Sequence, residues 1–182
     1  MITLAYDIET DGLNSKRIHC IVTQDIDTGL VEEYNDEKYT EEPKELPMGS
    51  NYSITTGLTS LMSADTIISH NGISYDVPQI EKHYPFFRDC NVKHYDTLIL
   101  SRFYHPNLLE VDLKRQWVTP TRLQGSHSLE AWGYRLKCYK GEFAKVTDWK
   151  EWSPDMQAYC KQDVAILAKL WHHFQKYLNP SS

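Results

Sequence analysis

The chain has 182 residues, of which 41% are hydrophobic, and this content is sufficient for the buried core of one compact domain. We therefore expect a single domain over residues 1–182. The formal net charge of −6 argues against a protein that coats nucleic acid by bulk electrostatics, because such proteins usually carry a basic stripe. An enzyme that acts on phosphodiesters through metal ions held by acidic residues remains compatible with this charge.

The cysteines and the hydropathy of the chain exclude two further classes. The four cysteines are widely spaced, form no C-x-x-C pair and follow no signal peptide, so neither a zinc ribbon nor a secreted disulfide framework is indicated. No apolar stretch approaches the roughly 20 residues that span a bilayer. We expect reduced thiols, a cytoplasmic location and no membrane insertion.

The first part of the chain predicts three antiparallel strands. They are Ile2 to Asp7, Arg17 to Thr23 and Leu30 to Tyr34, and the turns Asp11-Gly12 and Asp27-Thr28-Gly29 separate them. A meander of this kind places the first strand next to the second in the sheet.

After this meander, the segment from Asn35 to Asn51 is rich in acids and prolines, has no periodicity and predicts a loop. Helices and strands then alternate. The helices begin at Ser53, Asp76 and Asp96, with the second ending near Tyr84, and the strands are Thr66 to Ser69 and Val92 to Tyr95. This alternation after an antiparallel start predicts an α/β fold with a mixed sheet flanked by helices.

The C-terminal part predicts a loop from Arg115 to Ser126, a helix from Ser126 to Lys137 and a long final helix. Ser153 is the expected N-cap of that final helix, Pro154 its first residue and Asp155 an acid in its first turn. Its buried stripe consists of Met156, Cys160, Val164, Leu167, Trp171, Phe174 and Leu178.

Two pairs of residues are candidates for a functional site. Asp7 and Glu9 lie two apart, so they share one face if the first strand runs through Glu9. Close carboxylates repel each other unless a cation lies between them, and these hard oxygen donors suit magnesium or manganese rather than zinc. On the last helix Tyr159 and Asp163 are four apart and share a face. Each residue has an ordinary structural alternative, as does Asp76, which is also a suitable helix cap.

The order of the acids along the chain favours function. The segments Asp7-Ile8-Glu9, Asn71-Gly72-Ile73-Ser74-Tyr75-Asp76 and Tyr159-x-x-x-Asp163 resemble the three exonuclease motifs of the DnaQ-like, or DEDD, superfamily. This resemblance spans nearly the whole chain and implies a ribonuclease H-like fold. The tyrosine four residues before Asp163 matches the DEDDy branch, whereas the histidine-bearing branch has its histidine where this chain has Ala158.

Three further regions are similar to the proofreading domain of the family A DNA polymerases of short-tailed T-odd phages. They are His70-Asn71-Gly72 with Tyr75-Asp76-Val77-Pro78, Asp96-Thr97-Leu98 with Leu100-Ser101-Arg102, and Gly125-Ser126-His127 with Leu129-Glu130-Ala131-Trp132-Gly133-Tyr134-Arg135-Leu136. A chain ending at Ser182 has no room for the polymerase fingers, palm and thumb. Both a free-standing exonuclease and an excised domain agree with this length.

The resemblance implies a site with two divalent cations, Mg²⁺ or Mn²⁺. Asp7, Glu9 and Asp163 would bind one ion, and Asp7 would bridge to a second ion whose shell involves Asp76. Tyr159 would orient the attacking water by a hydrogen bond, because a free tyrosine has a pKa of about 10 and is a poor base at neutral pH.

Four residues are expected to contact the substrate. Thr10 and Leu13 match positions that hold the 3′ end in polymerase proofreading domains, Asn71 is expected to contact the substrate strand, and His127 its phosphates. Leu13 is equally compatible with a core residue after a turn, and Asn71 with an ordinary turn residue. The implied activity is metal-dependent 3′→5′ exonuclease action on single-stranded or frayed DNA, releasing nucleoside 5′-monophosphates.

Two alternatives stay open at the level of sequence. One is a 3′→5′ exoribonuclease like those of the ribonuclease D branch, because the 2′-hydroxyl contacts that distinguish RNA are not readable from one chain. The other is a noncatalytic accessory module of a DNA polymerase. The expected partners are a single-stranded DNA 3′ end and a separately encoded DNA polymerase, in the host cytoplasm if a phage encodes the chain. The sequence leaves open the biological role and the oligomeric state.

Overall fold

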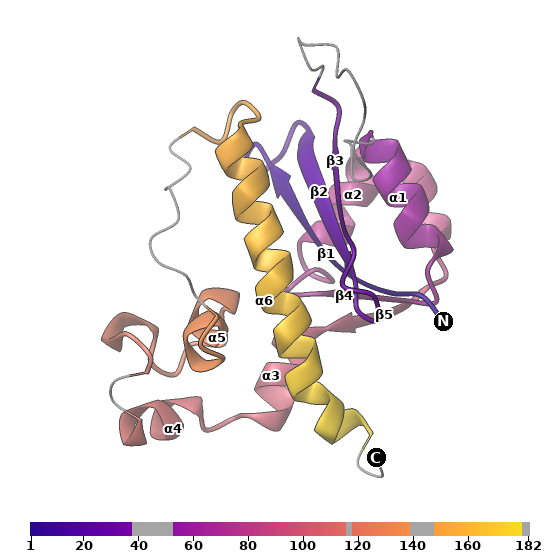
Figure 1. The fold of residues 1–182 in the computed structure, drawn as a ribbon. Helices are drawn as coiled ribbons and strands as arrows, with labels where there is room; N and C mark the ends of the chain where they lie inside the picture. Colours follow the sequence, from indigo (N-terminus) through magenta and orange to yellow (C-terminus); the bar gives the residue numbers. More distant parts are fainter. Residues whose placement is uncertain (38–52, 116–117, 139–147, 180–182) are drawn as a thin grey trace.

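A five-stranded mixed sheet forms the centre of the computed structural model, which describes residues 1–37, 53–115, 118–138 and 148–179 (Figure 1). The strands are β1 (Thr3–Thr10), β2 (Ile18–Asp25), β3 (Val31–Asn35), β4 (Thr66–Ser69) and β5 (Lys93–Asp96), in the spatial order β3-β2-β1-β4-β5. The first three strands are antiparallel, and β4 and β5 continue the sheet in parallel with β1. The prediction of a mixed α/β sheet with an antiparallel start is confirmed.

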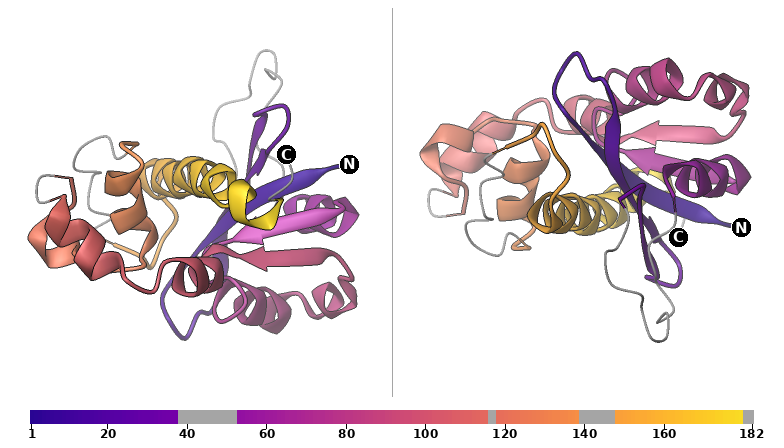
Figure 2. Two further views of the ribbon diagram at one scale, coloured as in Figure 1. Left: turned by 90° about the horizontal axis from the view of Figure 1, so that it is seen from below. Right: turned by 90° about the horizontal axis from the view of Figure 1, so that it is seen from above.

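Strand β1 separates the two layers of the core because its side chains alternate between the faces of the sheet. Leu4, Tyr6 and Ile8 pack against helices α1 (Ile54–Ser63) and α2 (Asp76–His83). Ala5 lies on the opposite face, against helix α6 (Pro154–Leu178). Figure 2 shows α6 on one side of the sheet and α1 and α2 on the other. Asp7 and Glu9 have the parity of Ala5, so they face α6.

Helix α6 begins as the sequence predicts. The Ser153 side chain accepts a hydrogen bond of 3.2 Å from the backbone N–H of Met156, and Pro154 is the first helical residue. Its first turns are buried against the sheet through Met156, Cys160 and Val164. This packing fixes which side of the helix faces β1 and therefore where Tyr159 and Asp163 lie.

A group of short helices packs beside the second half of α6. They are α3 (Thr97–Tyr104), α4 (Leu108–Lys114), the 3-10 helix η2 (Thr121–Leu123) and α5 (Leu129–Arg135). A core of Leu108, Trp132, Leu170 and Phe174, with Leu100 and Tyr104 packed against it, joins α3, α4 and α5 to α6. A second 3-10 helix, η1 (Pro85–Asp89), follows α2.

A buried ion pair ties α4 to α5. The Asp112 carboxylate accepts hydrogen bonds from Arg135 Nε at 3.0 Å and Nη2 at 2.7 Å, and from the backbone N–H of Gly125 at 2.9 Å. Burial acts to raise the pKa of Asp112, but these hydrogen bonds hold it below its ordinary value. The pair thus anchors the connection that precedes α5.

Several boundaries differ from the sequence prediction. Strand β1 continues to Thr10 rather than ending at Asp7, which meets the condition for Asp7 and Glu9 to share a face. Helix α4 was not predicted, and η2 lies inside the predicted loop from Arg115 to Ser126. Most of the loop predicted between Asn35 and Asn51 lies outside the described residues, and Asn35 itself ends β3. No helix in the described ranges is both long and apolar enough to cross a membrane.

Candidate active site

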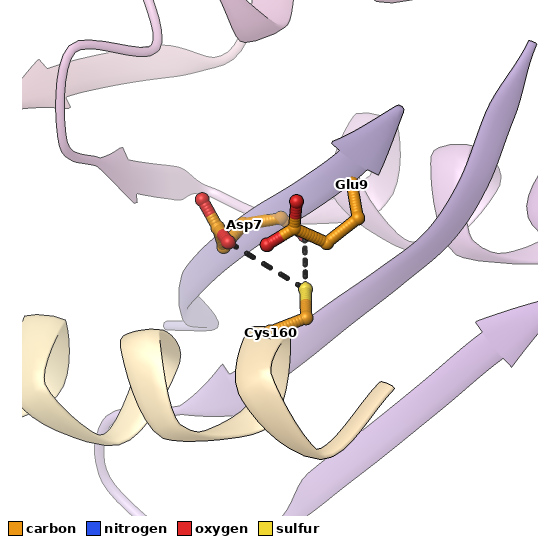
Figure 3. Close-up of side chains that lie close together, drawn as sticks. All are labelled: Asp7, Glu9 and Cys160. Atoms are coloured by element: carbon orange, nitrogen blue, oxygen red, sulfur yellow. Dashed lines mark hydrogen bonds between the residues drawn. The ribbon is translucent and has the colours of Figure 1, made fainter. Parts of the chain in front are cut away.

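The acidic pair of β1 meets the first turns of α6, where Cys160 points toward the strand (Figure 3). Ligand atoms of Asp7, Glu9 and Cys160 all lie within 4.8 Å of one another. The Cys160 thiol donates toward Asp7, with Sγ 3.4 Å from the backbone carbonyl oxygen and 3.6 Å from Oδ2. Two carboxyls and a thiol therefore converge on one point between the sheet and the helix.

The electrostatics of this pair are unfavourable to negative charge. Burial raises the pKa of Asp7 well above its ordinary value, and repulsion from Glu9, Asp76 and Asp163 raises it further. For Glu9, burial and the charges of Asp163 and Asp76 raise the pKa to about 8. The site therefore holds protons near neutral pH unless a cation replaces them. Its carboxyl oxygens are the donors that Mg²⁺ and Mn²⁺ prefer, so these residues fit divalent cations.

Asp76, the first residue of α2, supplies the third carboxyl. Its side chain is only 4% exposed, and its pKa is raised to about 7 by burial, with a further contribution from the charge of Asp96. Its charge in turn raises the pKa values of Asp7 and Glu9. Asp76 thus belongs to the same electrostatic environment, although it lies outside the 4.8 Å group.

A tight turn between β4 and α2 delivers Asp76 to the site. The Asp96 carboxylate accepts hydrogen bonds from the backbone N–H groups of Asn71 at 2.8 Å and Ile73 at 3.2 Å, and also caps α3. Gly72 sits so close to the chain that a Cβ at this position would lie 2.1 Å from Ser69 Oγ. Only glycine fits there without movement of its neighbours.

Asp163 and Tyr159 complete the site from α6. Burial raises the pKa of Asp163 to about 7, repulsion from Glu130 adds to the increase, and a hydrogen bond from the Tyr159 hydroxyl opposes it. The pKa of Tyr159 is raised above its ordinary value by burial and then by the charges of Asp163, Glu9 and Asp7. Tyr159 therefore keeps its proton and acts as a hydrogen-bond donor rather than a base.

Thr10 and Leu13 lie at the end of β1 and in the following turn. Thr10 is buried, and its hydroxyl shares a hydrogen bond of 2.7 Å with the Tyr75 hydroxyl and donates to the carbonyl of Gly12 at 3.1 Å. Leu13 is 86% exposed and is not a core residue. The turn thus presents an apolar side chain to solvent directly after β1, while the substrate roles of both residues stay predictions.

Asn71 and His127 occupy different settings. Asn71 is exposed and has a positive φ of 66°, as befits a residue in a tight turn. His127 Nδ1 shares a hydrogen bond of 2.7 Å with the Ser101 hydroxyl, whose oxygen accepts a hydrogen bond from Trp132 Nε1 at 2.8 Å. Burial and the charge of Arg135 lower the pKa of His127, which favours the neutral imidazole over the cation. Their contacts with substrate also stay predictions.

Comparison with known proteins assigns the chain to a family. The family model described as RNase H superfamily matches residues 4–175. The chain belongs to the RNase H superfamily. It is 30% identical to a DNA-directed DNA polymerase of Enterobacteria phage T3 over 92% of the chain and 26% of that protein. It is 36% identical to a DNA-directed DNA polymerase of Escherichia phage T7 over 57% of the chain and 18% of that protein.

A solved structure agrees with the fold of this RNase H superfamily protein. The family B DNA polymerase of the archaeon Pyrobaculum calidifontis matches 98% of the chain with a TM-score of 0.54, at 14% identity and over 25% of its own length. Because this identity is low, the match concerns the fold alone. The chain spans about a quarter of the length of the phage T3 polymerase it resembles, and less of the phage T7 polymerase.

Three residues at the site of this RNase H superfamily protein were not identified from the sequence. Cys160 was predicted only as part of the core stripe, yet its thiol contacts Asp7. Glu130 on α5 raises the pKa values of Asp163 and Tyr159, and Trp149 packs edge-on against the Tyr159 ring at 6.1 Å between centroids. Of these three residues, only Cys160 could have been connected with the site from the local sequence, because it directly follows Tyr159.

Proposed function

We propose that this protein is a metal-dependent 3′→5′ exonuclease of the DEDDy type. Its substrate is the 3′ end of single-stranded or frayed DNA, and its products are nucleoside 5′-monophosphates. The observation that carries the proposal is the shared acidic site around Asp7 and Glu9, where the charges of Asp76 and Asp163 raise the pKa values of both residues. The charges of Asp163, Glu9 and Asp7 also raise the pKa of Tyr159. The similarity to phage DNA polymerases supports DNA as the substrate.

The acids serve as the ligands of two divalent cations in this proposal. Asp7, Glu9 and Asp163 would hold one ion, and Asp7 with Asp76 would hold the other. Mg²⁺ or Mn²⁺ bound there supplies Lewis-acid activation of water and stabilises negative charge on the leaving 3′ oxygen. Because the pKa values of Glu9, Asp76 and Asp163 are raised to between about 7 and about 8, these groups release protons when a cation binds.

Tyr159 has a positioning role in the proposed reaction. Its hydroxyl stays protonated, since burial and the neighbouring carboxylates raise its pKa. A protonated hydroxyl next to Asp163 orients the attacking water by a hydrogen bond and cannot remove its proton. Loss of this hydroxyl should therefore weaken the activity, whereas loss of Asp7, which is shared by both ions, should abolish it.

The substrate end is proposed to lie along the turn that follows β1. Leu13 is exposed there and can pack against the terminal bases, and Thr10 lies between this turn and the acids. Asn71 and His127 are proposed to contact the strand and its phosphates. Single strands are held mainly by stacking and by backbone contacts, so little sequence preference is expected. The proposed setting is a single domain acting beside a separately encoded polymerase, in the host cytoplasm if a phage encodes it.

Digestion of a single-stranded DNA labelled at its 5′ end tests the proposal. The reaction is run with Mg²⁺ or Mn²⁺, with a chelator, and in parallel with an RNA of the same sequence. A metal-dependent ladder of shortening labelled products on DNA is expected for the wild-type protein, and none for Asp7→Ala. Faster loss of RNA would assign the protein to the ribonuclease branch. DNA binding without cleavage would favour the accessory module, and full activity of Asp7→Ala would refute the proposed metal site.

A further inference from the structure

The pairing of β1 with β2 skips one residue beside the acidic pair. Glu9 is opposite Cys20 and Thr10 is opposite Ile18, so His19 has no partner on β1 and forms a bulge. A bulge changes the direction in which a side chain points, and bulges are frequent next to active sites. His19 is only 2% exposed, so its polar ring needs partners within the protein.

Both ring nitrogens of His19 have such a partner, and the two contacts together fix the tautomer. Nε2 lies 2.9 Å from the backbone oxygen of Trp149, which can only accept, so Nε2 carries the proton and donates. Nδ1 then accepts a hydrogen bond of 3.0 Å from Arg17 Nε. A second proton on the ring would oppose Arg17, and the pKa of His19 is accordingly lowered, mainly by burial and further by the charge of Arg17. The donor side of His19 is thus directed at the segment that precedes α6.

This segment, residues 148–152, is drawn in orange directly before α6 in Figure 1 and contains Trp149. The Trp149 residue is 37% exposed, so burial alone does not fix its position. Its carbonyl is bound to His19, 130 residues earlier in the chain, while its ring packs edge-on against Tyr159 at 6.1 Å between centroids and 86° between planes. Edge-to-face aromatic pairs are favourable and orient both rings. The bond from His19 therefore places the indole, and the indole borders the Tyr159 ring.

The Tyr159 hydroxyl donates a hydrogen bond to Asp163 within the acidic site. Helix packing fixes the backbone of Tyr159, but its side-chain rotamer is selected by the contacts of the ring. We propose that the contact between His19 and Trp149 holds the Tyr159 hydroxyl in its place in the site, which makes His19 and Trp149 positioning residues. The inference rests on the proposed function, in which Tyr159 orients the attacking water, and it adds the residues on which that orientation depends.

NMR spectroscopy of protein with isotope-labelled tyrosine rings tests this hold on Tyr159 independently of nuclease activity. The Tyr159 signal is the one that is absent from Tyr159→Phe. In His19→Leu we expect this signal to shift, because the indole and its ring current are displaced. In His19→Gln it should stay near its wild-type position, since the glutamine amide keeps an N–H donor for the Trp149 carbonyl. Glu151→Gln, at an exposed position of the same segment, is the matched control.

The outcome of this experiment remains decisive if one variant is unstable. If His19→Leu fails to fold, His19→Asn replaces it, because asparagine is polar but too short to reach the Trp149 carbonyl. Trp149→Leu removes the ring itself and should also shift the Tyr159 signal. A signal that is unmoved in the folded His19 variant, or in Trp149→Leu, would overturn the inference.

The kinetic test is a double-mutant cycle between His19 and Tyr159. His19→Leu should lower kcat for digestion of single-stranded DNA by about three- to tenfold, with KM and Mn²⁺ affinity close to those of the wild type. In the Tyr159→Phe background the same change should have less than about a twofold effect, because the hydroxyl through which His19 acts is missing. Trp149→Phe, which keeps an aromatic edge, should retain more activity than Trp149→Leu. Equal losses of kcat in the two backgrounds would indicate a merely structural role and overturn the inference.

The two measurements distinguish this inference from the proposed function. A shifted Tyr159 signal in His19→Leu, together with no digestion by the wild type, supports the hold on Tyr159 and rejects the exonuclease. Digestion by the wild type, together with an unmoved signal in His19→Leu, keeps the exonuclease and rejects the positioning role.

Discussion

Replacement of Glu9 by glutamine should stabilise the metal-free protein at alkaline pH. The pKa of Glu9 is raised from 4.5 to about 8 in the folded state by burial and by the charges of Asp163 and Asp76. A raised pKa means that the folded protein holds this proton more tightly than the unfolded chain. This tighter binding of the proton stabilises the folded protein. The stabilisation is complete below the pKa of Glu9 in the unfolded chain, and it is lost as the pH rises through about 8.

The size of the effect follows from the shift. A change from 4.5 to about 8 corresponds to an upper limit of about 5 kcal/mol at high pH. The neighbouring acids titrate with Glu9 and relax part of this repulsion, so we expect Glu9→Gln to gain ~1–3 kcal/mol at about pH 9. For a chain of this size the gain raises the melting temperature by roughly 2–12 °C.

The assay is thermal unfolding in chelator at about pH 4 and about pH 9, on either side of the pH range in which the unfolded and folded proteins bind different numbers of protons. The wild type and Glu9→Gln should be nearly equal at the lower pH and differ at the higher one. Saturating Mn²⁺ should stabilise the wild type more than the variant, because the variant lacks one ligand. Glu151→Gln, at an exposed position, is the matched control and should show no such difference. A variant that is less stable than the wild type at the higher pH in chelator would refute this electrostatic account.

The remaining predictions concern the turn, the tyrosine and the buried ion pair. Gly72→Ala places a Cβ 2.1 Å from Ser69 Oγ and should reduce the free energy of unfolding by ~1–3 kcal/mol, and unchanged urea unfolding would contradict that close approach. Tyr159→Phe should reduce the rate of digestion while leaving Mn²⁺ affinity, measured by calorimetry, close to that of the wild type; lost affinity would instead make the tyrosine a determinant of the metal site. Arg135→Met leaves the Asp112 carboxylate buried without its cation and should destabilise the protein by ~3–5 kcal/mol in urea unfolding, with Lys114→Met, in an exposed pair, as the control.

The repeating patterns of the chain were sufficient to predict most of the elements but not all of their ends. The cap at Ser153 and the apolar stripe that follows it gave α6 correctly, because capping and helical periodicity are local. The end of β1 was placed three residues early, at the change from apolar to acidic residues. In the structure the pairing of Glu9 with Cys20 and of Thr10 with Ile18 on β2 carries the strand further. Hydrogen bonds to a neighbouring strand thus override the local change in polarity.

Helix α4 shows why a short helix was missed. Its burial departs from hydropathy at three positions, since Leu109 and Leu113 are about half exposed while Asp112 is 3% exposed. The reason is the ion pair with Arg135, which lies on another helix, α5, 23 residues further along the chain. A pattern method assigns the aspartate to solvent and the leucines to the core, so it finds no amphipathic helix at this position.

The sequence by itself determined the acids, their spacing on β1 and α6 and their resemblance to exonuclease motifs, because these depend only on residue type and local periodicity. Only the tertiary structure decided that these groups share one environment. The contact between Cys160 and Asp7 joins residues 153 apart in the chain, and the raised pKa values of Glu9, Asp76 and Asp163 arise from burial between the sheet and the helices. Burial and long-range electrostatic repulsion are properties of packed elements, and no local pattern encodes them.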